Sequence, residues 1–295
     1  MSTPSKKIFF IINPISGKGN YNLTAQVIQE VLSIELFDIY VSYSLYPKHA
    51  IELTHKALKN NPDAIVACGG DGTINEVASC LVGTKIPLGI IPIGSGNGLA
   101  SNLKIPKSID KALRVIEKFE VRIIDVGTIN NQYFFSNTGF GIDALIIKKY
   151  QENGSRTLTA YLIATLKSIV EYNYNLYDVT INTTQKQVKP FLFFISNSNE
   201  MGYGISLTPQ AVLDDGKLNL VIVPKINWFQ KIYFGLAIVF NKLHKVSFVS
   251  RLAINKVVCN HSLSQLIVQV DGEFFVTEAQ TITIAVIPGA LNVIA

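Results

Sequence analysis

The chain has 295 residues, of which 48% are hydrophobic, so it is long and apolar enough to form one large or two ordinary domains around a buried core. The formal charge of +5 is mild for this length and the lysines are scattered, which speaks against a nucleic-acid partner. Three cysteines without metal-ligand spacing indicate a reducing compartment. The longest apolar stretch, at residues 232–240, is far shorter than the roughly 20 residues of a membrane-spanning helix.

Strands and helices alternate in the first half of the chain. Short apolar runs predict strands, and apolar residues at helical spacing predict a helix after each of them. Repeated β–α units of this kind indicate a doubly wound parallel sheet in an α/β domain, which binds ligands at the carboxyl ends of its strands. We expect the strands at 8–12, 36–42, 64–68 and 88–91, and the helices at 23–32, 48–59, 74–81 and 109–119.

The pattern changes at about residue 125, where Tyr, Phe, Val and Thr become frequent in short runs. Mainly antiparallel strands are expected here, which indicates a β-sandwich-like second domain. A single strong helical pattern, at 158–169, interrupts them. The aromatic-rich helix region at 228–240 is interpreted as core packing in preference to a membrane-docking helix. We expect the strands at 132–136, 177–182, 188–196, 217–223 and 264–270.

A glycine-rich turn joins the strand at 64–68 to the helix that follows it. Glycines let the backbone approach a polyphosphate, and the free N–H groups of the following helix favour anions, so the turn predicts a phosphate cradle. Asp71 stands among these groups, where a bound Mg²⁺, a hydroxyl or a donor side chain would offset its charge. The alternative is a β-turn with an Asp cap. The motif consists of Gly69, Gly70, Asp71, Gly72, Thr73, Ile74, Asn75 and Glu76.

Two further glycine-rich loops follow predicted strands, so all three loops are expected at one edge of the sheet. The loop at 13–19 lacks the Lys-Ser/Thr step of a Walker A motif, and alone it is equally consistent with an ordinary β–α turn. In the loop at 94–98, Ser95 and Asn97 stand between glycines, where they can hydrogen-bond phosphate or ribose. A tight surface turn is the alternative for this loop.

These motifs, in this order, resemble the catalytic domain of the diacylglycerol kinase and sphingosine kinase family of lipid kinases, within the superfamily of NAD kinases and phosphofructokinases. Stretches at 139–144, 214–218 and 271–273 also recur at family-like spacing. The resemblance covers nearly the whole chain. It implies a nucleotide-binding domain at 1–125, a β-rich lipid-substrate domain at 126–287, and a last strand at 288–295 that returns to the first domain.

The resemblance implies ATP and Mg²⁺ as cofactors and assigns a set of nucleotide-binding residues. Ser44 belongs to this set because it stands where the family often has a nucleotide-contacting Thr, although from the sequence alone it is only a serine at the end of a strand. The set consists of Asn13, Ser44, Gly69, Gly70, Asp71, Gly72, Thr73, Asn75, Glu76, Gly94, Ser95, Gly96 and Asn97.

Two carboxylates compete for the role of proton acceptor. By resemblance Glu273 is the group that helps a substrate hydroxyl attack the γ-phosphate, and Asp71 is its rival, particularly in sphingosine kinase-like members. From the residues alone, 271–273 reads equally as an Asp-Gly hairpin turn that follows an apolar strand.

Two more acidic positions are assigned by resemblance. Asp215 aligns with an Asp that binds a structural Mg²⁺ together with main-chain carbonyls near Val212 and Lys217. From the residues alone, the same stretch reads equally as a hairpin turn entering a strand. Asp143 matches an acidic position of the substrate domain, where it either fixes a lipid headgroup or caps the helix that begins nearby.

The sequence therefore predicts an ATP-dependent lipid kinase that acts on diacylglycerol first and on a sphingoid base second. The loop at 94–98 is closer to sphingosine kinases than to many bacterial diacylglycerol kinases, which leaves the substrate open. Two alternatives are an NAD kinase, which the loop at 94–98 and the element at 271–273 disfavour, and a non-catalytic lipid-binding protein on the kinase fold, against which Asp71, Asp215 and Glu273 argue. We expect a cytoplasmic protein that associates peripherally with the inner face of the membrane, where its lipid substrate lies. The resemblance leaves open whether it forms a homodimer.

Overall fold

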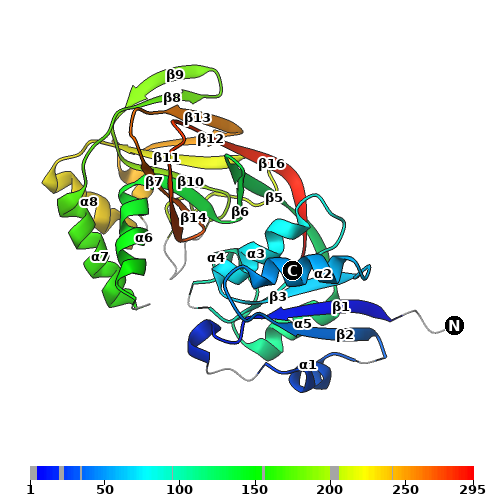
Figure 1. Ribbon diagram of the computed structural model, residues 1–295. Helices are drawn as coiled ribbons and strands as arrows, with labels where there is room; N and C mark the ends of the chain where they lie inside the picture. Colours follow the sequence, from blue (N-terminus) through cyan, green and yellow to red (C-terminus); the bar gives the residue numbers. More distant parts are fainter. Residues whose placement is uncertain are drawn as a thin grey trace. The chain divides into compact units, whose positions relative to one another are not determined.

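The computed structural model describes residues 5–19, 23–33, 35–94, 96–154, 157–199, 206–240 and 242–295 (Figure 1). The chain forms two compact units. Unit 1 consists of Met1–Val126 with Gly289–Ala295, and unit 2 consists of Gly127–Pro288.

Unit 1 alternates strands and helices, as the sequence predicts. The strands are β1 (Lys6–Ile12), β2 (Phe37–Tyr43), β3 (Ala64–Gly69), β4 (Leu88–Pro92), the first part of β5 (Val121–Ile129) and the last part of β16 (Thr281–Ile294). The helices are η1 (Ser16–Gly19), α1 (Ala25–Val31), α2 (His49–Leu58), α3 (Asp71–Leu81), α4 (Gly98–Asn102) and α5 (Ile109–Lys118).

The sheet of unit 1 is parallel and covered on both faces. Its strands lie in the order β2-β1-β3-β4-β16, and each neighbouring pair is parallel. Helix α2 packs beside α3 and α1 beside α5, and the two pairs cover opposite faces of the sheet (Figure 1). Every residue of β3 is buried, which explains its uninterrupted apolar sequence. This arrangement confirms the predicted doubly wound fold.

Unit 2 is an antiparallel β-sandwich. One sheet has the order β12-β11-β10-β7-β14-β15, and the other contains β9, β8, β13 and the first part of β16, with β5 and β6 beside it. Side chains from both sheets, such as Phe140, Phe193 and Val268 on one and Val179 and Val257 on the other, form a common core. The strands are β6 (Gln132–Phe134), β7 (Asn137–Gly141), β8 (Tyr177–Ile181), β9 (Thr184–Val188), β10 (Pro190–Ser196), β11 (Leu218–Pro224), β12 (Ser250–Ile254), β13 (Lys256–Asn260), β14 (Leu266–Val270) and β15 (Glu273–Thr277).

Three helices pack on the outer face of the six-stranded sheet, where the sequence predicted one strong helix at 158–169 and an aromatic-rich helix region at 228–240. They are α6 (Ile142–Glu152), α7 (Leu158–Glu171) and α8 (Trp228–Val239), and the short η2 (Leu243–Lys245) follows them. In β10, Phe193 and Ile195 face the sandwich core, whereas Leu192 and Phe194 face the helices, so the whole strand is apolar. The helical signal of α6 is weakened by its β-branched isoleucines, which favour strands.

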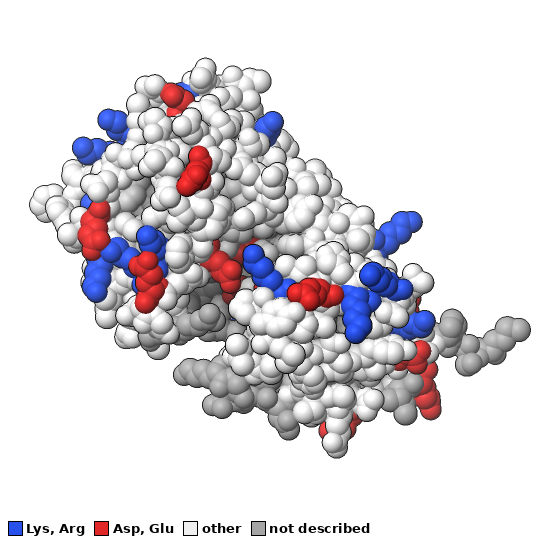
Figure 2. Space-filling model, in the orientation of Figure 1, with Lys and Arg blue, Asp and Glu red and all other residues white. Residues whose placement is uncertain are grey.

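The interpretation of residues 228–240 as core packing is wrong for most of α8. Phe234 and Ala237 are buried, but the rest of the helix surface is largely apolar and exposed, with Phe229 84% accessible. Among the residues that the structure describes, no helix is long and apolar enough to cross a membrane. On the face seen in Figure 2, basic and acidic side chains are scattered between uncharged surfaces.

Candidate active site

Loops from three strands of unit 1 meet at the carboxyl edge of the parallel sheet. Asn13, which follows β1, donates its main-chain N–H to Cys68 O at 2.9 Å and its side-chain amide to Thr73 Oγ1 at 3.1 Å. Ile93, which follows β4, donates its main-chain N–H to Gly69 O at 2.9 Å. The loops predicted from the sequence are therefore brought together in the fold.

The contact between two of these loops requires glycine. A Cβ atom at Gly94 would lie 2.5 Å from Gly70 Cα and 2.8 Å from Asn97 Oδ1, so no larger residue fits without separating the loops. Gly17, in η1, has φ of +58°, and a Cβ atom there would collide with the carbonyl oxygen of Ile93. The glycines predicted to admit a phosphate thus also allow the three loops to pack against one another.

Asp71 holds the second glycine-rich loop in place. Its Oδ2 accepts the N–H of Asn97 and its Oδ1 accepts the N–H of Gly98, both at 2.8 Å. Gly98 begins α4, so the carboxylate lies at a helix N-terminus, where a negative charge is favourable. From the sequence we expected a metal, a hydroxyl or a donor side chain to offset this charge, but main-chain N–H groups of the neighbouring loop do so.

The first turn of α3 presents donors for an anion. The helix begins at Asp71, earlier than the predicted 74, because Gly70 is its N-cap in an extended conformation. The N–H of Ile74 bonds Gly70 O at 3.0 Å, whereas the N–H groups of Gly72 and Thr73 precede the first intrahelical acceptor. Such a helix N-terminus can bind phosphate oxygens.

The remaining predicted residues of unit 1 lie on α3 and at the end of β2. Asn75 Oδ1 accepts a hydrogen bond from Ser79 at 3.2 Å, and Glu76 Oε1 accepts the N–H of Lys48 at 3.1 Å, which ties the loop before α2 to α3. Ser44 is buried at the end of β2 and donates its N–H to Ile12 O at 2.9 Å.

The second loop is further shaped by Asn97. This residue has φ of +58°, and its Nδ2 donates to Gly94 O at 2.5 Å, while its buried Oδ1 has no hydrogen-bond partner in the described part of the chain. A Cβ atom at Gly96 would lie 2.6 Å from Asp71 Oδ2, so this glycine allows the carboxylate to reach the loop. Ser95 lies outside the described residues.

In unit 2, Glu273 follows a hairpin turn that is anchored by its neighbour Asp271. Asp271 and Gly272 have φ of 47° and 82°, as a two-residue hairpin between β14 and β15 requires, which confirms the turn. The carboxylate of Asp271 accepts N–H groups from Phe135, Ser136 and Asn137 at 2.8–3.0 Å. Glu273 itself is exposed, and its carboxylate makes no hydrogen bond with any described residue.

Asp143 is linked to this turn through Gln269. Gln269 Nε2 lies 3.4 Å from Asp143 Oδ2, and Gln269 Oε1 accepts the N–H of Gly272 at 3.2 Å. Asp143 is only 8% exposed, and burial raises its pKa to about 7, against the opposing effect of hydrogen bonds that include the one from Gln269. It lies in the first turn of α6, but the N-cap is Gly141, so of the two alternatives left open for Asp143, the helix cap is wrong.

The polar residues that surround this turn were not expected from the sequence. The side chains of Asn137, Thr138, Ser196, Asn197 and Gln269 are buried at one end of the six-stranded sheet. Gln269 Nε2 bonds Asn137 Oδ1 at 2.8 Å, and Thr138 Oγ1 bonds Gln269 O at 2.7 Å. The available signal was a glutamine inside the otherwise apolar strand β14, because a buried amide needs nearby partners.

The predicted metal position is a turn before β11. Asp215 Oδ1 accepts the N–H of Lys217 at 3.0 Å, and Gly216 has φ of +71°. Val212, three residues before Asp215, is exposed. The preceding strand β10, which pairs with β11, already ends at Ser196, so the turn at Asp215 is no hairpin turn between the two strands. The described residues hold no cluster of three or more His, Cys, Asp or Glu side chains suited to a metal, so a cation here would depend on main-chain oxygens.

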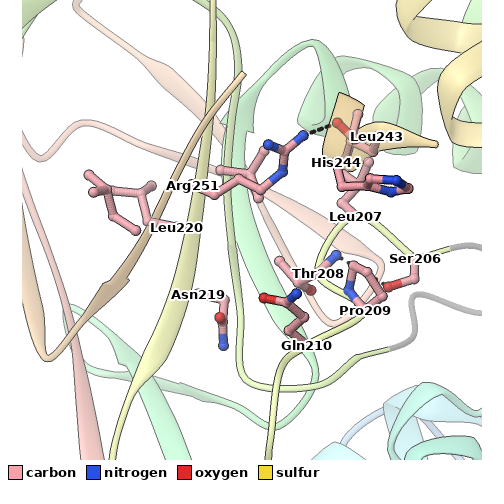
Figure 3. Close-up of a pocket in the computed structure, with 12 residues that line it drawn as sticks. Ser206, Leu207, Thr208, Pro209, Gln210, Asn219, Leu220, Leu243, His244 and Arg251 are labelled. Carbon is pink, nitrogen blue, oxygen red and sulfur yellow. Dashed lines mark hydrogen bonds between the residues drawn. The ribbon is translucent and has the colours of Figure 1, made fainter. Parts of the chain in front are cut away.

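A separate pocket opens beside the edge strand β12 of unit 2 (Figure 3). Arg251 points into it, and its guanidinium donates to the carbonyl oxygen of Leu243. The side chains of Asn219, Gln210 and His244 also line it. None of the described site residues that were predicted from the sequence lines this pocket.

Comparison with known proteins identifies the family. Residues 7–129 match the diacylglycerol kinase catalytic domain, and residues 136–295 match the YegS C-terminal NAD kinase beta sandwich-like domain. The chain belongs to the YegS-like family of probable lipid kinases. Relatives named probable lipid kinase YegS-like are 32% identical over 179 residues in Chromohalobacter salexigens and 30% identical over 213 residues in Klebsiella pneumoniae. The matched regions cover 59% and 70% of this chain, and 58% and 72% of the respective YegS-like relatives.

Solved structures share this fold. A diacylglycerol kinase from Bacillus anthracis has a TM-score of 0.72 at 20% identity, covering 99% of this chain and 97% of that one. An NAD kinase from Archaeoglobus fulgidus, in complex with ATP, has a TM-score of 0.55 at 15% identity, covering 98% and 93% of the two chains. These likenesses concern the fold of the YegS-like chain.

Proposed function

We propose that this YegS-like chain transfers the γ-phosphate of ATP to the hydroxyl of diacylglycerol, forming phosphatidic acid. The hydroxyl oxygen bonds to the γ-phosphorus, the bond between that phosphorus and the ADP oxygen breaks, and the hydroxyl proton passes to a carboxylate. The observation that carries the proposal is the convergence of three loops on the N-terminus of α3, which offers main-chain donors to a polyphosphate. Membership of a kinase family supports ATP as the donor.

The nucleotide is proposed to bind in unit 1. The N–H groups of Gly72 and Thr73 would bind phosphate oxygens, and the loop at 94–98 would complete the cradle from the other side. Asp71 is proposed as a positioning residue that fixes this second loop, since both of its oxygens already accept main-chain N–H groups. Protonation of either oxygen would weaken those hydrogen bonds, which makes Asp71 poorly suited to accept the substrate proton.

Glu273 is the proposed proton acceptor. Its carboxylate has no hydrogen bond to a described residue, so a lone pair is available, and the anchored Asp271 turn fixes its main chain. Asp143 is proposed to contact the lipid headgroup, because its buried Oδ1 has no hydrogen-bond partner among the described residues. A neutral, protonated Asp143 could donate a hydrogen bond to a glycerol oxygen.

Mg²⁺ is the proposed metal. At the turn before β11, Asp215 Oδ1 bonds Lys217 N–H and its other oxygen makes no bond to a described residue, so one carboxylate oxygen and main-chain oxygens near Val212 and Lys217 suit a hard cation. These residues would hold a structural ion. A second ion carried by ATP would neutralise charge on the phosphates.

The function is tested by incubating the purified protein with radiolabelled ATP and, in separate reactions, diacylglycerol, sphingosine and NAD. Label in phosphatidic acid is the expected result. Label in sphingosine phosphate would identify a sphingoid-base kinase, and label in NADP would identify an NAD kinase, whose fold this chain shares at 15% identity. Transfer to none of them would favour a non-catalytic lipid-binding protein.

The base is tested by Glu273→Gln, which keeps the shape of the side chain but cannot take up the proton. We expect kcat to fall roughly 10² to 10⁴-fold with ATP affinity unchanged. Glu278→Gln, just after the other end of β15, is the matched control and should keep wild-type turnover. Wild-type turnover in Glu273→Gln would return the role of base to Asp71.

A further inference from the structure

Unit 2 carries an exposed apolar surface on two helices, and none of the site residues described above lies on it. A surface helix normally presents polar residues to solvent, whereas both of these helices present long aliphatic and aromatic side chains. We call this surface the α7–α8 face. Its most exposed members are Leu162, Leu166 and Val170 of α7 and Phe229, Ile232 and Val239 of α8.

The two helices are held firmly, so the exposure does not come from a loose end. Helix α8 starts with a capping box in which Asn227 and Gln230 each accept a main-chain N–H of the other at 2.9 Å. Lys231 Nζ of α8 donates to the carbonyl oxygen of Ile169 in α7 at 3.3 Å. Buried residues of both helices, Ala164 and Phe234 among them, belong to one hydrophobic cluster. The outward side chains therefore form a fixed apolar surface.

The chain around α8 has only one sign of charge. Every charged side chain between Gly216 and Val270 is basic. Three of these lysines flank α8 in sequence and are exposed, namely Lys225, Lys242 and Lys245. On α7 the acidic side chain Glu171 is paired with Lys149 Nζ at 2.6 Å, and Lys167 is exposed. Apolar helices whose neighbouring unpaired charges are lysines are complementary to an anionic lipid surface, where acyl chains accept the apolar residues and phosphates accept the lysines.

We propose that the α7–α8 face docks on an anionic lipid bilayer, with its apolar side chains entering the interface. Helix α8 has 12 residues, too few to span a bilayer, so it would lie in the plane of the membrane. Trp228 is exposed at the start of the helix with Lys231 Nζ 4.9 Å from its ring, and tryptophan is favoured at the membrane interface. The choice of a lipid as the occupant rests on the proposed lipid kinase function.

A second copy of the chain fits this face less well. In a two-fold dimer the same patch lies on both subunits, so the unpaired lysines of the two helices and their flanks in one copy would meet those of the other. Like charges facing each other across an interface oppose association. Anionic phospholipids present the opposite charge, which favours the bilayer.

The test measures cosedimentation of the purified protein with vesicles of phosphatidylcholine, alone or mixed with phosphatidylglycerol. We expect binding to the anionic vesicles, weakened by raising the salt from about 0.1 M to about 0.5 M. Phe229→Ser should weaken binding about tenfold or more, because one large apolar side chain no longer enters the interface. Ile232→Ser should weaken it in the same direction, whereas Ile123→Ser, on β5 of unit 1, should not. Ile232 and Ile123 are similarly exposed, at 57% and 55%, so the two variants are a matched comparison.

Equal vesicle binding by Phe229→Ser and the wild type would overturn the proposal, as would absence of wild-type binding to anionic vesicles. A wild-type dimer in sedimentation velocity that Phe229→Ser converts to a monomer would assign the face to a second copy instead. Kinase activity is measured separately on short-chain diacylglycerol in detergent, where all three serine variants should match the wild type. Vesicle binding without phosphorylation of any lipid would leave docking intact and refute the kinase function. Phosphorylation of a lipid without vesicle binding would refute docking alone.

Discussion

Replacement of Asp71 by asparagine separates two roles that a carboxylate can play in this site. The wild-type side chain accepts two main-chain hydrogen bonds at 2.8 Å, from Asn97 and Gly98. Asparagine keeps one acceptor oxygen and turns an NH₂ group toward the other main-chain N–H. One charge-assisted hydrogen bond is lost, worth about 1.5–3 kcal/mol. The lower end of this energy range applies because Asp71 is only partly buried.

If Asp71 positions the second loop, this loss appears in nucleotide binding. We expect Kd for ATP with Mg²⁺ to rise about 10 to 30-fold, with a smaller loss of kcat at saturating ATP. If Asp71 is the base, kcat falls roughly 10² to 10⁴-fold and Kd stays the same. Isothermal titration calorimetry and initial rates on the same preparation distinguish these outcomes.

A matched control lies at the opposite edge of the same sheet. Asp63 Oδ2 accepts the N–H of Lys7 at 2.8 Å, just before β3 begins, so Asp63→Asn makes the same chemical change away from the glycine-rich loops. It should leave both Kd and kcat unchanged. An Asp71→Asn enzyme with wild-type ATP affinity and a hundredfold lower kcat would refute the positioning role.

The remaining predictions concern three other positions. Gly96→Ala should weaken ATP binding, since its Cβ would lie 2.6 Å from Asp71 Oδ2. The control Gly235→Ala, with open space at its Cβ, should not, and equal affinities of the two variants for ATP in calorimetry would contradict this. Burial raises the pKa of Asp143 to about 7, whereas its value in the unfolded chain is near 4, so the wild type should lose stability relative to Asp143→Asn as the pH rises from 4 through 7. Melting temperatures of the two proteins that follow the same pH dependence from pH 4 to 8 would disprove this. Asp271→Ala removes the acceptor of three main-chain N–H groups and should lower the unfolding free energy of unit 2 by about 3–5 kcal/mol in urea titrations, and a change under about 1 kcal/mol would count against it.

Local patterns carried most of what the sequence revealed about unit 1. Continuous apolar runs such as β3 and helical spacing after them identify each β–α unit, and parallel order places the loops at one edge. The partner of Asp71 could not be predicted in this way. Its donors, Asn97 and Gly98, are main-chain groups 26 and 27 residues away, and no side-chain pattern records where an N–H will point.

In unit 2 the sequence revealed strands more readily than helices or surfaces. An alternating or apolar run is visible locally, as in β14, and the Asp-Gly pair predicts the hairpin after it. Exposure depends on tertiary packing. Helix α8 is apolar nearly all round, so its sequence alone does not distinguish a helix buried in a core from one in which Phe234 and Ala237 are the buried residues.

The same physical device recurs in both units and bears on which carboxylate does the chemistry. Asp71 and Asp271 each lie at a turn and use their oxygens to accept main-chain N–H groups from a distant segment, which fixes the backbone there. A carboxylate committed in this way loses those hydrogen bonds when it takes up a proton, so proton transfer to it would loosen the loop that it holds. Glu273 stands two residues after Asp271 and makes no bond to a described residue, so it can accept a proton while its neighbour keeps the turn in place. In the proposed reaction, positioning by one acidic residue and proton transfer by another would therefore cost less reorganisation than proton transfer to Asp71.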